Sequence, residues 1–171
     1  MDVSILSAVF ISVLGTLLHF TYDWFGNNPI IGAFSAVNES TWEHLKLLFF
    51  PTLIVTIIGA IYYKGRIPNY VCARLKGLFT AMFFTVTFFY TSMGVLGKNY
   101  AFLNILIFYV AVIIGEIIVN RQIKLAKPCN TNKAWIGFGI LLVCFILFTY
   151  NAPKIGLFKD PITGGYGIIG N

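Results

Sequence analysis

The chain has 171 residues, of which 58% are hydrophobic, 17% are aromatic and only 11% are charged. Soluble globular domains carry roughly 25% charged residues, so this composition excludes an ordinary water-soluble fold and indicates an integral membrane protein. The net charge of +6 comes from Lys and Arg residues near the ends of apolar runs. These residues do not form a folded basic domain. We therefore expect the lipid bilayer as a partner and no nucleic acid.

Five apolar runs are long enough for transmembrane helices, which need about 20 residues to cross a hydrocarbon core of roughly 30 Å. The alternation typical of barrel strands is missing, which favours an all-α, polytopic helical bundle. No basic segment precedes the first run, so we expect no cleaved signal peptide. We predict one domain over residues 1–171, with spans over residues 3–22, 40–63, 75–95, 100–119 and 134–150.

Two segments outside the spans are too apolar to be simple solvated loops. Residues 24–38 are rich in Gly, Pro and Asn but also hold several apolar residues, and we expect a re-entrant or interfacial loop between the first two spans. The tail, residues 151–171, has turn signals at Asp160-Pro161 and at Gly164-Gly165 between apolar residues. We expect the tail to fold back over one end of the bundle.

The second span has a recognisable start and an internal proline. Ser40 followed three residues later by Glu43 predicts a capping box. Pro51 cannot donate a hydrogen bond to the carbonyl of Leu47, so we expect a kink there, with the part of the span before it lining a polar cavity.

Lys and Arg are concentrated around two of the connections between spans. They are Lys64, Arg66, Arg74 and Lys76 after the second span, and Arg121, Lys124, Lys127 and Lys133 between the fourth and fifth. Short cytoplasmic loops are enriched in these residues. We therefore expect a multi-pass protein of the cell membrane with a cytoplasmic N-terminus and an extracytoplasmic C-terminus.

The three cysteines, Cys72, Cys129 and Cys144, are far apart and form no CxxC pattern. This spacing predicts neither a disulfide framework nor a zinc knuckle, and we expect all three to act as small apolar residues.

Residues 19–46 hold nearly all of the acid and imidazole chemistry of the chain. Both histidines and three of the six carboxylates lie here with one lysine: His19, Asp23, Glu39, Glu43, His44 and Lys46. The short connection brings the outer ends of the first two spans together. Helical spacing places His19 beside Asp23 and Glu39 beside Glu43. We expect these side chains to converge in one outward-facing cavity.

Two interpretations of this cluster stay open. Ionisable groups at the edge of lipid are costly unless they are paired, bind a ligand or face water. The cluster is therefore either a set of caps and pairs, with Glu43 bound to Lys46, or a binding site. Lys46 neutralises only one of three acids, which favours an added cation.

Imidazole and carboxylate together are ligands of zinc, manganese or iron, whereas calcium prefers oxygen ligands. We take His19, Glu43 and His44 as candidate metal ligands, although the spacing matches no specific metal motif. A metal needs neutral imidazole, so binding should weaken as the pH falls through about 6.5. A haem with His19 and His44 as axial ligands is a further alternative.

Three functional classes follow. A metal-assisted membrane enzyme acting on a lipid or an exported small molecule accounts for the histidines and carboxylates. A transporter or substrate-capture subunit accounts for the kinked second span. In that case Glu116, inside the fourth predicted span, would relay protons or cations. Pairing with a cation is the usual state of such a residue. A structural or accessory subunit accounts for the lack of a precise motif. The sequence fixes neither substrate nor oligomeric state.

The stretches HFTYDWFGNN, VNESTWEHLKLLFFP and FKDPITGGYG together resemble a family of small prokaryotic multi-span membrane proteins with no known activity. The resemblance implies the same arrangement of spans, and it covers both the polar cluster and the tail. It implies no catalytic or binding residue.

Overall fold

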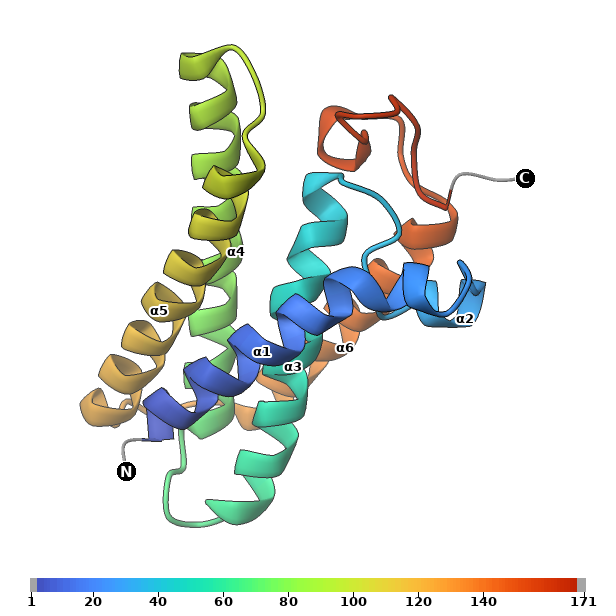
Figure 1. Ribbon diagram of the computed structural model, residues 1–171. Helices are drawn as coiled ribbons and strands as arrows, with labels where there is room; N and C mark the ends of the chain where they lie inside the picture. Colours follow the sequence, from blue (N-terminus) through green and yellow to red (C-terminus); the bar gives the residue numbers. More distant parts are fainter. Residues whose placement is uncertain (1–2, 169–171) are drawn as a thin grey trace.

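The computed structural model describes residues 3–168, which form helices joined by short connections (Figure 1). Within these residues, the one departure from helix and loop is an isolated antiparallel bridge between Lys159 and Tyr166. The helices are α1 (Val3–Trp24), α2 (Pro29–Gly32), α3 (Thr41–Tyr62), α4 (Tyr70–Leu96), α5 (Ala101–Leu125), α6 (Thr131–Tyr150) and the short 3-10 helix η1 (Gly156–Phe158).

Five of these helices, α1, α3, α4, α5 and α6, are long and apolar enough to cross a membrane. Their outward faces carry large apolar side chains that an aqueous surface would not tolerate at this density, among them Ile5, Phe83, Ile117 and Ile140. The expected all-α bundle of five spans is confirmed.

Two of the predicted span boundaries are wrong by five or six residues. The third span begins at Tyr70, where residue 75 was expected, and the fourth continues to Leu125, where residue 119 was expected. The additional residues at both ends include Lys or Arg, which a prediction from apolar runs leaves outside a span. Arg74 is tolerated because it is buried in an ion pair, whereas Arg121 and Lys124 are exposed near the end of α5.

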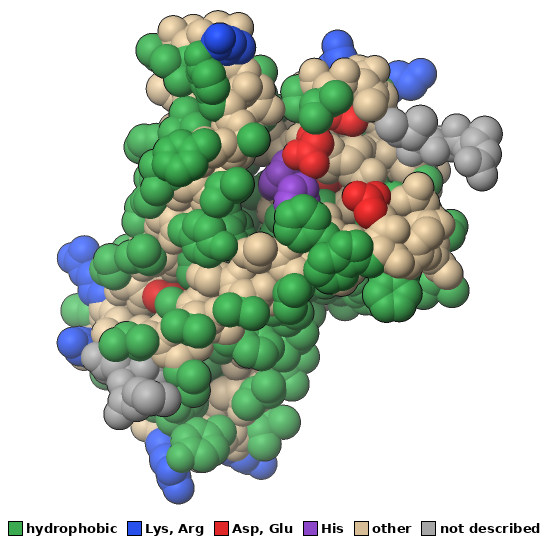
Figure 2. Space-filling model, in the orientation of Figure 1, with side chains coloured by type: hydrophobic (Ala, Val, Ile, Leu, Met, Phe, Trp, Pro, Cys, Tyr) green, Lys and Arg blue, Asp and Glu red, His purple; other side chains and the backbone are tan. Residues whose placement is uncertain are grey.

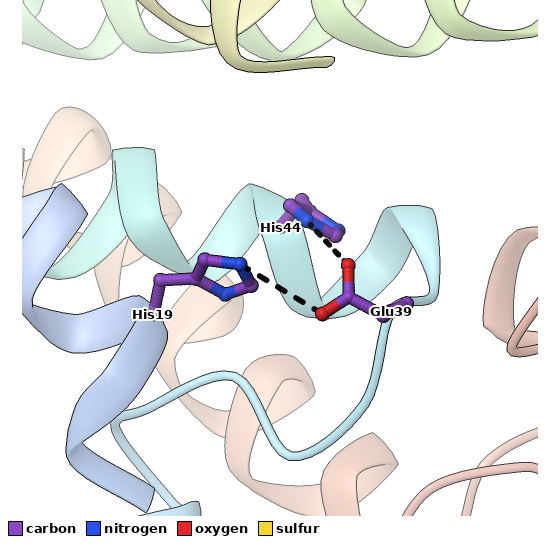
Figure 3. Close-up of side chains that lie close together, drawn as sticks. All are labelled: His19, Glu39 and His44. Atoms are coloured by element: carbon purple, nitrogen blue, oxygen red, sulfur yellow. Dashed lines mark ion pairs between the residues drawn. The ribbon is translucent and has the colours of Figure 1, made fainter. Parts of the chain in front are cut away.

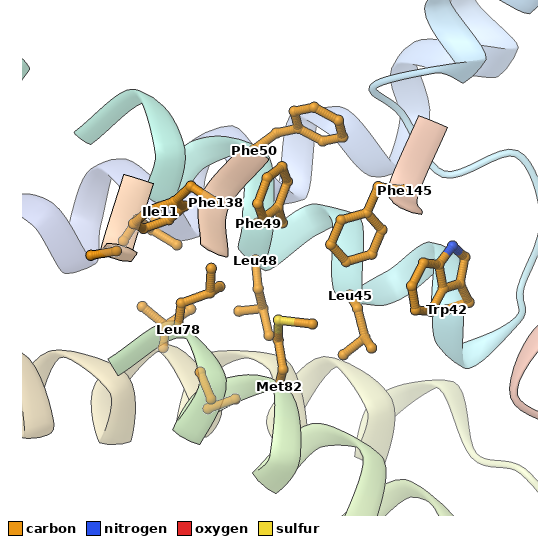
Figure 4. Packing of buried hydrophobic residues seen from close by; sticks show 14 of the residues in the cluster. Ile11, Trp42, Leu45, Leu48, Phe49, Phe50, Leu78, Met82, Phe138 and Phe145 are labelled. Atoms are coloured by element: carbon orange, nitrogen blue, oxygen red, sulfur yellow. The ribbon is translucent and has the colours of Figure 1, made fainter. Parts of the chain in front are cut away.

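Helix α3 lies at the centre of the bundle and provides most of the core. Of its most apolar segment 56% is buried, against 33% or less in the other four spanning helices. Figure 4 shows Leu48 and Phe49 of α3 packed with Phe138 and Phe145 of α6 and with Met82 of α4. Aromatic rings therefore join α3 to α6, whereas aliphatic side chains such as Leu48, Leu78 and Met82 fill the space between α3 and α4.

Helices α4 and α5 form a tall antiparallel hairpin beside α3 (Figure 1). The two backbones approach closely at Gly77 and Gly115. A Cβ atom on Gly77 would lie only 2.7 Å from the carbonyl oxygen of Gly115. Glycine is required here because any larger side chain would separate the two helices.

The start of α3 is capped on one side only. The Ser40 hydroxyl accepts a hydrogen bond from the Glu43 amide at 3.4 Å. The Glu43 carboxylate, however, accepts from the amide of Val37 at 3.2 Å, and the Ser40 amide donates to the side chain of Asn38 at 2.9 Å. The predicted capping box is therefore half formed, because Asn38 takes the place of Glu43. Pro51 lies inside α3, and a kink there stays a prediction.

The segment between α1 and α3 folds onto the end of α1. It contains the short helix α2, which begins after Asn28, and Ser35, whose side chain hydrogen-bonds the Leu18 carbonyl and the Tyr22 amide. Helix α2 is partly exposed, with Ile30 at 72%. The segment is thus neither a span nor a free loop, as expected.

The tail folds back over the same end of the bundle. Phe158 is buried against Trp42, with the ring centroids 4.8 Å apart. The side-chain amide of Asn38 donates to the Gly167 carbonyl at 2.7 Å, and the Ile168 amide donates to the Thr149 carbonyl at 2.9 Å. The folded-back tail predicted from its apolar residues and turns is therefore confirmed up to residue 168.

The prediction of three independent apolar cysteines is wrong for two of them. Cys72 of α4 and Cys129, in the connection between α5 and α6, form a disulfide with their Cα atoms 6.2 Å apart. Cys144 is free. The two bonded residues are 57 positions apart in the chain, so only the pairing of the helices brings them together.

Candidate functional site

A groove of about 400 Å³ lies between the end of α1, the start of α3 and the upper part of the α4–α5 hairpin. Figure 2 shows the histidine side chains at the base of this hollow, with acidic side chains beside them. The walls are mainly apolar and include Leu47, Ile105 and Phe108, with Asn99 and Asn104 as polar members.

His19, Glu39 and His44 converge at the base of the groove (Figure 3). The Nε2 atom of His19 lies 3.7 Å from one carboxylate oxygen of Glu39, and the Nε2 atom of His44 lies 3.4 Å from the other. One potential ligand atom from each residue can be chosen so that all three lie within 4.8 Å of one another. The three side chains are between 21% and 38% exposed, so a ligand in the groove can reach them.

Each of the three residues comes from a different local structure. His19 lies in the last turns of α1 and His44 in the first turn of α3, while Glu39 lies just before the cap residue of α3. The short connection between α1 and α3 brings these three positions to one level of the bundle.

The orientation of the His44 ring is fixed by its second nitrogen. His44 Nδ1 lies 2.9 Å from the carbonyl oxygen of Ser40. A carbonyl oxygen only accepts hydrogen bonds, so Nδ1 carries a proton. Nε2, which faces Glu39 at 3.4 Å, is the nitrogen that pairs with this carboxylate when it is protonated and that can bind a cation when it is not. This is the usual arrangement of a metal-binding histidine, in which a bond to the outer nitrogen sets the tautomer.

The His19 ring is packed beside that of His44, with the centroids 5.3 Å apart. Its Nδ1 atom is buried and has no hydrogen-bond partner among residues 3–168. The ring position is therefore set by packing and by the Nε2 contact with Glu39.

The geometry of the three side chains fits a metal ion. An ion with tetrahedral bonds of about 2.1 Å holds its ligand atoms about 3.4 Å apart, so the observed separations need only small side-chain rotations. Three protein ligands leave one coordination position for water or substrate. The haem alternative finds no support, because both Nε2 atoms approach the Glu39 carboxylate, where the macrocycle would have to lie.

Glu43 and Lys46 face away from the groove and form a buried ion pair. Lys46 Nζ lies 2.6 Å from Glu43 Oε2, and the two side chains are 0% and 1% exposed. Lys46 also donates to the Gly32 carbonyl at 2.7 Å and to the Thr149 hydroxyl at 2.8 Å. All three ammonium protons thus have partners, and the pair joins α3 to α6 and to the end of α2.

Asp23 does not join the histidines. It is exposed on α1, and within residues 3–168 its side chain takes part in no hydrogen bond or ion pair. The structure therefore brings His19, Glu39 and His44 together, places Glu43 and Lys46 in a separate buried pair, and leaves Asp23 at the surface.

The family comparison assigns no activity to these residues. The model of a family of unknown function, DUF6512, matches residues 2–168. The chain belongs to this family. No curated protein and no solved structure matches it.

A second buried ion pair in this DUF6512 protein lies at the other end of the bundle. Glu116 of α5 pairs with Arg74 of α4, and Arg74 also donates to the hydroxyls of Tyr70 at 3.0 Å and Ser7 at 2.5 Å. Arg74, which the sequence groups with the cations near a loop, is fully buried. Pairing therefore accounts for Glu116 inside a span.

The polar wall of the groove escaped sequence reasoning. Asn104 Nδ2 donates to Asn99 Oδ1 at 2.8 Å, and Tyr109 and Thr16 share a hydrogen bond of 3.0 Å across α5 and α1. One signal was available, namely that Asn104 lies inside an otherwise apolar run and so marks the face of α5 that turns toward a polar site.

Proposed function

We propose that this DUF6512 protein is a membrane enzyme that binds a divalent metal ion through His19, Glu39 and His44 and acts on an amphipathic, lipid-like substrate in the groove. The observation that carries the proposal is the convergence of three ligand side chains, one with its tautomer fixed by Ser40, at the base of an open groove.

The donor set selects the kind of ion. Two imidazoles and one carboxylate suit zinc, manganese or iron, and the same set holds catalytic zinc in metal-dependent peptidases. An ion with a free coordination position polarises a carbonyl or phosphoryl oxygen and activates water. Glu39, whose carboxylate oxygens face the Nε2 atoms of both imidazoles, would complete the set of three ligands.

The walls of the groove select the kind of substrate. Leu47, Ile105 and Phe108 offer an apolar surface suited to a hydrocarbon chain, whereas Asn99 and Asn104 offer amide groups at the same end as the histidines. A molecule with a polar head and an apolar chain satisfies both. The cation-rich loops lie at the opposite end of the bundle, which under the positive-inside rule supports an extracytoplasmic position for the groove.

The proposal is tested with purified protein in neutral detergent and with matched variants. Zinc, manganese or ferrous iron should raise the melting temperature of the wild type, because a ligand that binds only the folded state stabilises it. Glu39→Gln and His44→Ala should lose this response. Asp23→Asn removes a carboxylate four residues from His19 but outside the groove, and it should respond as the wild type does.

Activity is then measured on reconstituted protein with a panel of ester and phosphodiester lipids. We expect product release that depends on the added metal, is lost in Glu39→Gln and is kept in Asp23→Asn. Turnover that is equal in both variants, or that survives a chelator, would contradict the proposed function.

Ion transport is the second candidate, and one observation favours it. The Oε2 atom of Glu116 is buried without a hydrogen-bond partner among residues 3–168, beside a small cavity between α1, α3, α4 and α5. A relay role predicts metal or proton flux in proteoliposomes that Glu116→Gln abolishes.

A further inference from the structure

A second cavity, of about 350 Å³, lies at the opposite end of the molecule from the histidines. It is bounded by the first turns of α4, the last turns of α5, the connection between α5 and α6, and the first turn of α6. Three lysines from three of these segments line it: Lys76, Lys127 and Lys133.

The charge of this cavity is uncompensated. None of its lining residues is acidic, and within residues 3–168 none of the three lysines forms an ion pair. The nearby carboxylate of Glu116 is already bound to Arg74. The Lys76 ammonium is held by the side chain of Gln122 at 3.0 Å. All three lysine side chains are exposed, so water screens part of their mutual repulsion, and an anion held between them would lower it further.

The N-terminus of α6 adds to the positive electrostatic potential of the cavity. Asn130 caps this 20-residue helix by accepting a hydrogen bond from the Lys133 amide at 3.0 Å. The other first-turn amides have no partner within the helix, and the positive end of the helix dipole lies here. The positive end of the α6 dipole thus lies beside the lysine side chains of the cavity.

The disulfide holds these parts in place. Lys76 lies four residues after Cys72, on the same face of α4. Lys127 precedes Cys129 by two residues and Lys133 follows it by four. The bond between Cys72 and Cys129 therefore ties the segment that carries two of the lysines to the helix that carries the third.

We propose that this cavity binds a phosphate group, supplied by the head group of an anionic lipid or by free phosphate. The cavity lies at the ends of helices that are long and apolar enough to cross a bilayer, and the phosphates of a bilayer that they span would lie near these ends. Basic pockets between spans at such a level suit phospholipid head groups. The proposal is independent of the metal site, which lies at the other end of the bundle.

The test is a titration of the purified protein in neutral detergent with phosphatidylglycerol, phosphatidylcholine or inorganic phosphate. The melting temperature is measured at each ligand concentration. Phosphatidylglycerol should raise it more than phosphatidylcholine does. A response to inorganic phosphate as well would name free phosphate as a ligand, and a response to the lipid alone would name the head group. Equal responses to the two lipids, with none to phosphate, would overturn the proposal.

Matched variants separate a built site from general surface charge. Replacing Lys76, Lys127 and Lys133 by Gln should weaken binding about 100-fold, at about five-fold for each lysine. Replacing Lys64, Arg66 and Lys124 by Gln removes the same charge outside the cavity and should have little effect. Equal losses in both variants would overturn the proposal.

Folding and the disulfide have their own controls. The triple Lys→Arg variant keeps the charge and should keep binding, and the single variant Lys127→Gln, in an exposed connection, should fold and still lose about five-fold. Reduction of the disulfide should weaken binding several-fold. Unchanged binding after reduction would overturn the part of the proposal in which the disulfide shapes the site.

Discussion

Replacing Lys46 by Met tests the buried ion pair that holds α3, α6 and the end of α2 together. Methionine has a similar length but carries no charge, so the substitution leaves Glu43 as an uncompensated carboxylate that is 1% exposed. The Val37 amide at 3.2 Å and the Thr149 hydroxyl at 3.2 Å would be its remaining partners.

The expected cost is large. Removing one partner of a buried pair costs about 3–5 kcal/mol, because the other charge stays buried alone. For a chain of this size about 1 kcal/mol lowers the melting temperature by about 2–4 °C, so we expect a decrease of about 6–20 °C. The double variant Lys46→Met/Glu43→Gln has no buried charge at this position, and it should recover most of the loss.

Thermal unfolding in detergent, followed by tryptophan fluorescence, measures this effect. Trp42 is a suitable reporter, since its ring lies 4.6 Å from that of Phe145 in the contact between α3 and α6. Lys64→Met removes an exposed lysine and should change the melting temperature little. If Lys46→Met melts with the wild type, or if the double variant is no more stable than the single one, the account of this pair is incorrect.

Three further predictions concern the helix packing and the orientation. Gly77→Leu should destabilise the protein by about 1–3 kcal/mol, because a Cβ atom there would lie 2.5 Å from Val119 Cγ2. Gly94→Leu is the control, since a Cβ atom there meets nothing within 4 Å, and this variant should melt near the wild type. Arg74→Leu leaves Glu116 buried and unpaired and should be destabilising, while Arg74→Leu/Glu116→Leu should recover much of the loss in the same melting assay. In a Cys144→Ala background, a membrane-impermeant thiol reagent added to cells should label Lys98→Cys and leave Gly65→Cys unlabelled; the reverse pattern would contradict the predicted orientation.

The labelling experiment also decides between two general rules that disagree for this chain. The positive-inside rule places the connection between α5 and α6 in the cytoplasm. The same connection holds Cys129, which is bonded to Cys72, and disulfides usually persist only in oxidising compartments. Labelling of Gly65→Cys from outside the cell would favour the rule based on the disulfide.

The arrangement of the spans was predictable because it depends on properties that are local in sequence. Runs of about 20 apolar residues mark a spanning helix wherever they occur, and the short connection after His19 fixed α1 and α3 as neighbours. The ends of α4 and α5 were less predictable, since the charge of Arg74 inside a spanning helix is balanced by Glu116, which lies 42 residues further along the chain.

The candidate site shows where periodicity fails. Helical spacing pairs His19 with Asp23 and Glu39 with Glu43. Glu39, however, lies before the start of α3, so helical periodicity does not govern its direction. Its carboxylate turns back toward both histidines, while Glu43, about 100° around α3 from His44, faces the interior. Lys46, the partner of Glu43, is held in the interior by its bonds to Gly32 and Thr149. These tertiary contacts separate Glu43 from the two histidines.

The disulfide was not predictable from the sequence for a related reason. Spacing reveals cysteine pairs only when they belong to a local motif. Cys72 and Cys129 meet because α4 and α5 run antiparallel along most of their length and return the chain to the first turn of α4. That contact is a consequence of the helix hairpin, which apolar patterning alone does not place.

The most direct test of the metal site is element analysis of protein purified without a chelator and reconstituted with zinc, manganese or ferrous iron. We predict one metal ion per chain in the wild type and in Asp23→Asn, and much less than one in Glu39→Gln and His44→Ala. A wild-type protein that retains none of these ions, or a Glu39→Gln variant that retains as much metal as the wild type, would contradict the assignment of His19, Glu39 and His44 as a metal site.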